Sequence, residues 1–162
     1  MPVDTKTAER RDLRLSSMEE LRSELDRIQA AHDAGTLSHT GNWSPGQVLE
    51  HLAIFMECAF DGFPSRAPFF VRWIAIPMFK KKAVSGEPMP PGFKLPKQAS
   101  FMLPGDATTF EQGMSRLRDC LARLDAGDRF THPSPLLGKL SHEQWIRMQL
   151  GHCSMHLSFL SY

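Results

Sequence analysis

Apolar residues recur at spacings of three and four in four separate segments of this chain, and this periodicity favours a helical fold. Each segment starts at a hydroxyl residue that can cap a helix: Ser16 or Ser17, Ser44, Thr108 or Thr109, and Ser141. The first three end near Gly35, near Asp61 and Gly62, and before Gly127. No strand-like alternation and no internal repeat stand out. We therefore predict an all-α protein.

The connections between these segments predict the directions of the helices. The links between the first and second helices and between the third and fourth are short or moderate, so each pair should be antiparallel. The connection over residues 63–107 is long and lets the second and third helices run parallel. Its segment PFFVRWIAIPMF and the lysines that follow predict a short helix over about 69–82. The predicted fold is a four-helix bundle of up-down-down-up order with a long crossover between helices two and three.

The size and composition of the chain set its class. A length of 162 residues with 41% hydrophobic content suits one domain with a substantial core. We assign residues 16–162 to this domain and residues 1–15 to a flexible N-terminal arm. A net charge of +1 provides no general attraction to nucleic acid. Three widely spaced cysteines, a polar N-terminus and the lack of an apolar stretch long enough to span a bilayer favour the cytoplasm.

Three histidines are the candidate metal ligands. His152 and His156 are four residues apart and share one helix face. At 1.5 Å per residue, His51 lies about 9 Å from the start of its helix, and the His152–His156 midpoint lies about 10–11 Å from the end of the last helix. These levels coincide in antiparallel helices, so the imidazoles can meet at one ion. The alternative is that each histidine is a polar residue at the edge of the core, bonded to a neighbouring group.

The same segments resemble the DinB-like superfamily, in particular an uncharacterised branch of it. The resemblance covers most of the chain and is strongest in RRDLRL, in GNWSPGQVLEHLA with FDG after it, and in GKLSHEQWIRMQLGHCSMHL. It implies an up-down-down-up bundle in which His51, His152 and His156 hold a divalent metal. Relatives often have a histidine doublet where this chain has Met155-His156. Characterised relatives imply a transferase or isomerase that uses a low-molecular-weight thiol such as bacillithiol or mycothiol, or a hydrolase.

Three neutral imidazoles leave one coordination position of a divalent metal free. The ion can activate water for hydrolysis, or deprotonate a thiol for transfer to an electrophile. Zn, Ni and Fe(II) all suit nitrogen ligands. We favour thiol transfer to a small-molecule substrate, with a metal-dependent hydrolase or a non-catalytic binding bundle as alternatives. The sequence assigns no catalytic acid or base, and it is compatible with a homodimer.

Several other residues are secondary candidates. Each metal-ligating histidine should donate its second ring N–H to an acceptor, for which Glu50, Glu57 and Gln149 are candidates. Trp43 is expected to pack before the Ser44 cap. Cys58 is expected to be a small buried hydrophobe, with a place in the lining of the pocket as the alternative. The other histidines, His32, His39, His132 and His142, are expected to face solvent.

The run Lys80-Lys81-Lys82 follows an aromatic segment that contains Phe69, Phe70 and Trp73. We interpret this segment as a lid over the end of the bundle. Contact with an anionic substrate or a membrane surface is one alternative, and a plain solvated helix is another.

Overall fold

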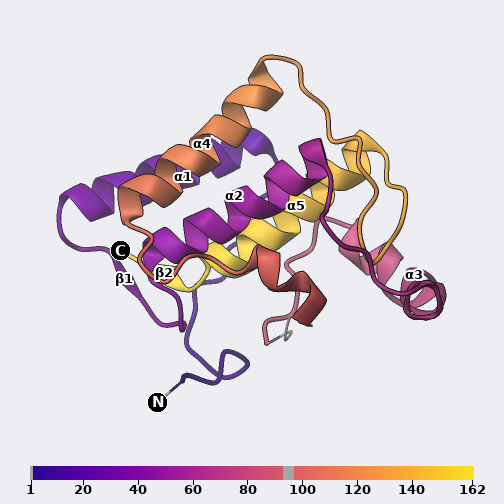
Figure 1. Ribbon diagram of the computed structural model, residues 1–162. Helices are drawn as coiled ribbons and strands as arrows, with labels where there is room; N and C mark the ends of the chain where they lie inside the picture. Colours follow the sequence, from indigo (N-terminus) through magenta and orange to yellow (C-terminus); the bar gives the residue numbers. More distant parts are fainter. Residues whose placement is uncertain (1, 93–96) are drawn as a thin grey trace.

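The computed structural model describes residues 2–92 and 97–162 and is mostly helical (Figure 1). Its helices are α1 (Met18–Asp33), α2 (Pro45–Asp61), α3 (Phe69–Ala83), α4 (Phe110–Asp125) and α5 (His142–Leu157), with a 3-10 helix, η1, over Lys97–Met102. Two short strands, β1 (Ser38–His39) and β2 (Leu160–Ser161), pair antiparallel. Among the described residues, no helix is both long enough and apolar enough to cross a membrane.

Side-chain caps fix the helix starts. Ser44, Thr109 and Ser141 each accept a hydrogen bond from the backbone N–H three residues later, and the glutamine at that position accepts one from the cap residue's N–H. In α1 the cap is Ser17, which accepts from the N–H of Glu20. These reciprocal bonds satisfy backbone donors that have no partner inside the helix. The observed start of each bundle helix therefore confirms the start predicted from the sequence.

Helices α2 and α4 run parallel and approach each other very closely at their first turns. A methyl group on Gly46 would lie 2.4 Å from the carbonyl oxygen of Thr109, and one on Gly113 would lie 2.3 Å from the carbonyl oxygen of Gly46. At the far ends of both helices, Arg123 of α4 makes a two-point ion pair with Asp61 of α2. The lack of a Cβ at both glycines is therefore what lets these two backbones meet.

Helix α5 runs antiparallel to α2. His51, early in α2, lies against His152, late in α5. One turn further along α2, the Phe55 carbonyl accepts a hydrogen bond from Gln149, which lies earlier in α5. The start of α2 and the end of α5 therefore lie at the same level of the bundle, although they are far apart in the sequence.

Helix α1 runs antiparallel to α4, since Arg22 near its start pairs with Asp125 and His32 near its end contacts Glu111. The resulting order is up-down-down-up, with the long crossover between α2 and α4, and this confirms the predicted fold. The apolar faces of α1, α2, α4 and α5 form the core, whose fully buried side chains include Leu25, Leu52, Leu117, Trp145 and Leu157.

Two elements were not expected from the sequence. The strand pair joins the link between α1 and α2 to the residues after α5, in the register Ser38 with Ser161 and His39 with Leu160. Strands of two residues carry no alternating pattern, so periodicity cannot reveal them. The other is η1, within the long connection. Helix α3, in the same connection, agrees with the helix predicted over about 69–82.

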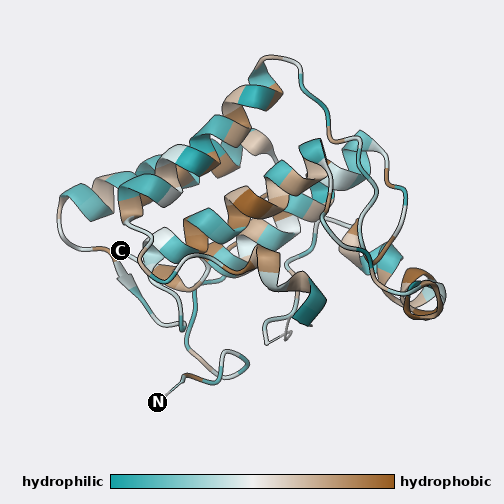
Figure 2. Cartoon of the chain, viewed as in Figure 1, coloured by the Kyte–Doolittle hydropathy of each residue, from teal (hydrophilic) through white to brown (hydrophobic). Residues whose placement is uncertain are grey.

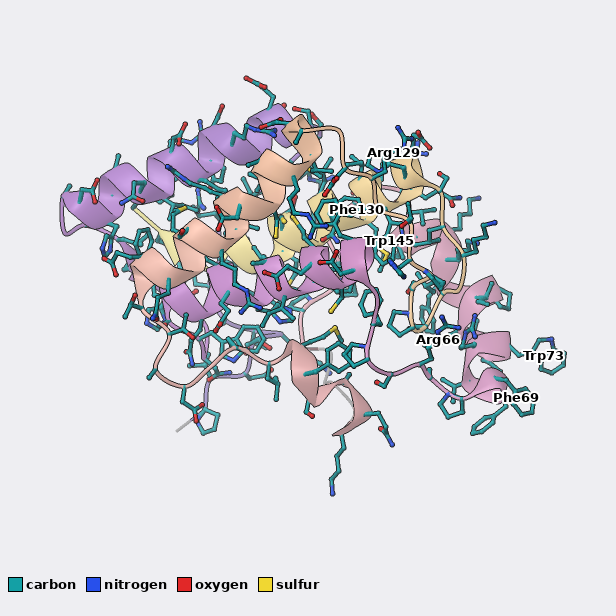
Figure 3. The ribbon with its side chains drawn as sticks, turned by 45° about the horizontal axis from the view of Figure 1, so that its top comes forward. Arg66, Phe69, Trp73, Arg129, Phe130 and Trp145 are labelled. Carbon is teal, nitrogen blue, oxygen red and sulfur yellow. The ribbon has the colours of Figure 1, made fainter. Side chains whose placement is uncertain are left out.

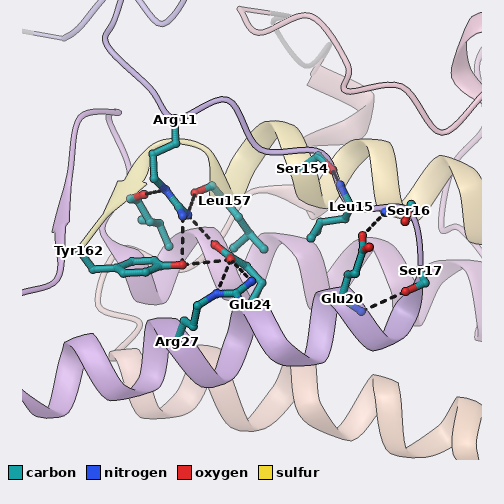
Figure 4. Close-up of polar contacts among 11 residues, drawn as sticks. Arg11, Leu15, Ser16, Ser17, Glu20, Glu24, Arg27, Ser154, Leu157 and Tyr162 are labelled. Carbon is teal, nitrogen blue, oxygen red and sulfur yellow. Dashed lines mark hydrogen bonds and ion pairs between the residues drawn. The ribbon is translucent and has the colours of Figure 1, made fainter.

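The N-terminal segment contacts the bundle through Arg11 (Figure 4). Its guanidinium donates hydrogen bonds to the carbonyls of Leu160 and Leu157 and pairs with Glu24 of α1 at 2.6 Å. The backbone N–H of Leu15 donates to the hydroxyl of Ser154 in α5. In the structure, the segment before α1 therefore joins both α1 and the end of α5.

Candidate metal centre

Two antiparallel helices position three imidazoles beside one another. His51 lies in the second turn of α2, and His152 and His156 lie one turn apart in the last part of α5. One ring nitrogen from each residue can be chosen so that all three atoms lie within 4.8 Å of one another. The structure therefore brings together all three histidines that the sequence singled out.

The ring of His51 has a defined orientation and tautomer. Its Nδ1 lies 2.6 Å from the carbonyl oxygen of Met102, the last residue of η1. Because a carbonyl oxygen can only accept, Nδ1 carries the proton and donates it. The lone pair of His51 is then on Nε2, which lies 3.2 Å from Nε2 of His152. Two imidazole nitrogens at this distance need either a proton or a cation between them.

The spacing of the nitrogens fits a metal ion. With metal–nitrogen bonds of about 2.0–2.1 Å, the 3.2 Å separation of the His51 and His152 Nε2 atoms corresponds to an angle of roughly 100° at the ion, near the tetrahedral value. A shared proton would explain the approach of two rings but gives no role to the third. His156 also faces this point, with its ring centroid 4.6 Å from that of His51 and 4.7 Å from that of His152.

Aromatic side chains enclose the three rings. Trp43 stacks on His156, with the ring planes 14° apart, and its ring centroid lies 4.7 Å from that of His51. Phe55 packs edge-on against His152 at 4.6 Å between centroids. His51 and His152 are buried, and His156 is partly exposed. Access to the imidazoles is therefore restricted mainly to the side of His156.

Removal from water favours the neutral form of all three imidazoles. Burial lowers the pKa of His51, an effect that its bond to Met102 partly offsets. Burial, and then repulsion from the neighbouring imidazoles, hold the pKa of His152 and of His156 well below the usual value. Neutral imidazole is the form that binds metals, so the site is electrostatically prepared for a cation.

A family model described as "Protein of unknown function (DUF1569)" matches residues 7–162. The chain belongs to this family. No curated protein and no solved structure matches the chain.

Two buried polar atoms beside the histidines of this DUF1569 protein have no hydrogen-bond partner among the described residues. They are Nδ1 of His152 and Oε1 of Gln149. Gln149 is completely buried and lies three residues before His152, so both side chains lie on the same face of α5. Nδ1 of His152 can donate a proton when His152 uses Nε2 as a ligand, and Oε1 of Gln149 can only accept one. The two atoms are therefore chemically complementary.

The other two suggested acceptors are engaged elsewhere. Glu50 and Glu57 both form ion pairs with Arg116 of α4. Glu50 also accepts from the N–H of Gly105 and from the hydroxyl of Thr108. Of the three candidate acceptors, these two carboxylates are therefore already occupied by other groups. They link α2 to α4 and to the end of the long connection.

Sequence reasoning missed two residues that contact the candidate site. Met102 contributes its backbone carbonyl, which no side-chain pattern can signal. Trp43 was expected only to pack before the Ser44 cap, yet it lies against two of the imidazoles. Its place directly before the helix that carries His51 was the one available clue.

The remaining described histidines and cysteines do not belong to this group of possible ligands. His39 is exposed, whereas His32, His132 and His142 are partly buried rather than fully solvent-facing. Burial raises the pKa of the Cys58 thiol to about 11, so it remains protonated at neutral pH. Cys153 is fully buried, and burial raises its pKa further. Neither thiol is therefore an activated nucleophile.

Helix α3 does not form the expected lid. The N–H of Ala67, just before it, donates to the Pro135 carbonyl, and Lys80 donates to the Lys139 carbonyl. Both acceptors precede α5, whereas His152 and His156 lie toward its end. The interpretation of α3 as a lid over the bundle end is therefore wrong for the end that holds the histidines. The part of the long connection that reaches them is η1, through Met102.

Proposed function

We propose that this DUF1569 protein is a metal-dependent enzyme in which His51, His152 and His156 bind one divalent cation. The observation that carries the proposal is the approach of the Nε2 atoms of His51 and His152 to 3.2 Å while Nδ1 of His51 is committed to a carbonyl. The third imidazole and the depressed pKa values support the same reading. Zn, Ni and Fe(II) suit these ligands. The resemblance to the DinB-like superfamily supports the assignment of all three residues.

The reaction we favour is transfer of a low-molecular-weight thiol to a small electrophilic substrate. When bound, a divalent cation lowers the pKa of a thiol or water that occupies its free coordination position. The raised pKa of Cys58 and the full burial of Cys153 argue that the thiol is a co-substrate and not a cysteine of the chain. In this scheme Met102 orients His51, and Trp43 and Phe55 exclude water from the imidazoles. A metal-dependent hydrolase is the second candidate, because the same ligands also activate water.

Metal analysis of protein purified without a histidine tag tests the metal site. We expect about one divalent ion per chain, with loss of the ion in His152→Ala and retention in the matched control His39→Ala, since His39 is exposed and lies in β1. A chain that carries no ion and shows no affinity for added Zn, Ni or Fe(II) would falsify the proposal. So would equal metal content in His152→Ala and wild type.

A second experiment separates the two reactions. The metal-loaded protein is assayed with a panel of small thiols crossed with electrophiles, and with hydrolysable esters and amides in the absence of thiol. Thiol transfer predicts turnover that depends on both thiol and metal. Turnover that needs only metal and water would assign a hydrolase instead. A metal-loaded protein without either activity would support a non-catalytic binding bundle.

We place this enzyme in the cytoplasm. The three cysteines are free, and two of them are buried, as expected for a protein kept in a reducing compartment.

A further inference from the structure

Helix α3 carries most of the exposed apolar surface of the described residues. Ten large hydrophobic side chains are exposed among all the described residues. Seven of these ten belong to α3, which has 15 residues. The two most exposed are Phe69 at 83% and Trp73 at 81%, and both point away from the bundle in Figure 3. Aromatic side chains are rarely so exposed without a partner, so this concentration marks a contact surface. The other members are Phe70, Val71, Ile74, Met78 and Phe79.

This apolar surface stands out from the molecule and is not part of the core. Helix α3 lies at the edge of the fold in Figure 1, and Figure 2 shows apolar residues over much of its visible surface. Only Ala75 of the helix is buried. Arg72 and Ile76 approach Gly138, and Lys80 donates to the Lys139 carbonyl. One side of α3 is thus held by the loop before α5, and the other sides are open.

The charges on the segment that carries this surface all have one sign. Between Asp61 and Glu87 the only charged residues are Arg66, Arg72 and the three consecutive lysines 80–82. The whole chain has a net charge of only +1, so the remainder of the molecule is net acidic and the positive charge is local. Arg66, Lys81 and Lys82 are exposed, and Arg66 lies on the segment that leads into α3 (Figure 3). A partner for this surface must therefore be apolar and anionic at once.

We propose that α3 binds flat to the surface of a membrane that contains anionic lipids. Phe69, Phe70 and Trp73 insert at the boundary between headgroups and acyl chains, where aromatic rings are favoured, and Lys81 and Lys82 contact anionic headgroups. The helix is about 22 Å long and lies in the interface plane without crossing the bilayer. A second copy of α3 fits less well, because it would add four positive charges and no acidic side chain.

Vesicle co-sedimentation of the full-length protein tests this assignment. The probes are vesicles of phosphatidylcholine alone and of phosphatidylcholine mixed with phosphatidylglycerol, each at low and high NaCl. We expect binding to the anionic vesicles that falls at least tenfold in high salt or with phosphatidylcholine alone. The emission of Trp73 should shift to shorter wavelength on binding, and Trp73→Phe should abolish this shift.

Matched variants assign the binding to α3. The double variant Phe69→Ser/Trp73→Ser should lose vesicle binding, and Lys81→Ser/Lys82→Ser should lose the preference for anionic lipid. Val3→Ser, which alters an exposed apolar residue far from α3 in sequence, should bind like wild type. All these side chains are exposed, and unchanged circular dichroism of each variant confirms that it folds.

Two outcomes would overturn the proposal. One is that wild type fails to bind anionic vesicles, or that Phe69→Ser/Trp73→Ser binds them equally well. The other is a wild-type dimer by light scattering that this double variant converts to a monomer, without vesicle binding by either. The second result would assign the surface to contact between copies of the chain.

Discussion

His51 shows how one backbone group can orient a candidate metal ligand. Its Nδ1 donates to the Met102 carbonyl at 2.6 Å, and this bond fixes both the plane of the ring and the position of its lone pair. His152 has no equivalent support, since its Nδ1 lacks a partner among the described residues. If His152 coordinates through Nε2, its Nδ1 carries a proton and needs an acceptor. Gln149 offers the unused oxygen closest in sequence on that face of α5.

Gln149→Leu tests this support. Leucine has a similar volume but no acceptor, so we expect a metal dissociation constant about tenfold higher than that of wild type. Gln149→Glu keeps an acceptor at the same position, so its metal dissociation constant should stay close to that of wild type. Zn²⁺ competition against a chromophoric chelator measures these constants.

A purely structural role for Gln149 predicts a different pattern. In that case Gln149→Leu would change the thermal midpoint of the metal-free protein while the Zn²⁺ dissociation constant stayed at the wild-type value. The comparison therefore separates support of the ligand from packing of α5.

At the scale of elements, the contact between α2 and α4 is set by two glycines. The backbones meet where Gly46 faces Thr109 and Gly113 faces Gly46, with no room for a methyl group on either glycine. This contact positions the first turns of α2, directly before His51. The geometry of the candidate metal centre thus depends on a backbone contact on the other side of α2.

Gly46→Ala should destabilise the fold. The added methyl carbon would lie 2.4 Å from a backbone oxygen, and backbone cannot move aside as a flexible side chain can. Overpacking of this kind costs about 2 kcal/mol of unfolding free energy, which outweighs the helix propensity gained from alanine. Urea unfolding followed by circular dichroism measures the loss.

The matched control is Gly41→Ala, whose methyl group would lie at an ordinary 3.5 Å from Phe159. It should unfold within about 0.5 kcal/mol of wild type. Equal stability of Gly46→Ala and wild type would show that α2 and α4 can separate at little cost.

Elements with a local signature were predictable from the sequence. Three capping boxes and the apolar spacing gave the bundle helices, and the connection lengths gave their directions. The approach of His51 to the His152–His156 pair followed from those directions. The features that were not predicted have no local signature in the sequence. The strand pair has only two residues per strand, and η1 contributes a backbone carbonyl. The position of α3 depends on contacts with the loop before α5.

At the scale of the whole molecule, Glu24 joins three distant parts of the chain. It is almost fully buried, at 1% exposed, and accepts hydrogen bonds from Arg11 before α1, from Arg27 within α1 and from the last residue, Tyr162 (Figure 4). Burial alone would raise the pKa of Glu24, but the hydrogen bonds from Arg11, Arg27 and Tyr162 outweigh burial and hold this pKa below its usual value. The ionised carboxylate therefore stabilises the fold.

Glu24→Gln should make the stability less dependent on pH. Because the pKa of Glu24 is lower in the folded state, its contribution is fully present above the unfolded pKa and is lost as pH falls through the folded pKa. We expect the variant to lose about 2 kcal/mol of unfolding free energy at pH 7. The difference from wild type should shrink toward zero in strongly acidic buffer.

Urea unfolding at pH 7 and at several acidic values measures this difference. Glu19→Gln, at an exposed position in the first turn of the same helix, is the control and should follow wild type closely. A loss for Glu24→Gln that is the same at every pH would mean that shape, and not charge, holds the three segments together.

The bond from Met102 to His51 has a further consequence for how the family can vary. Every amino acid supplies a main-chain oxygen, so replacement of the buried Met102 by another residue that fits the same space leaves the acceptor in place. Insertions or deletions in the preceding crossover would displace that oxygen even with every histidine retained. Changes in chain length just upstream of η1 should therefore disturb the centre more than substitutions at position 102.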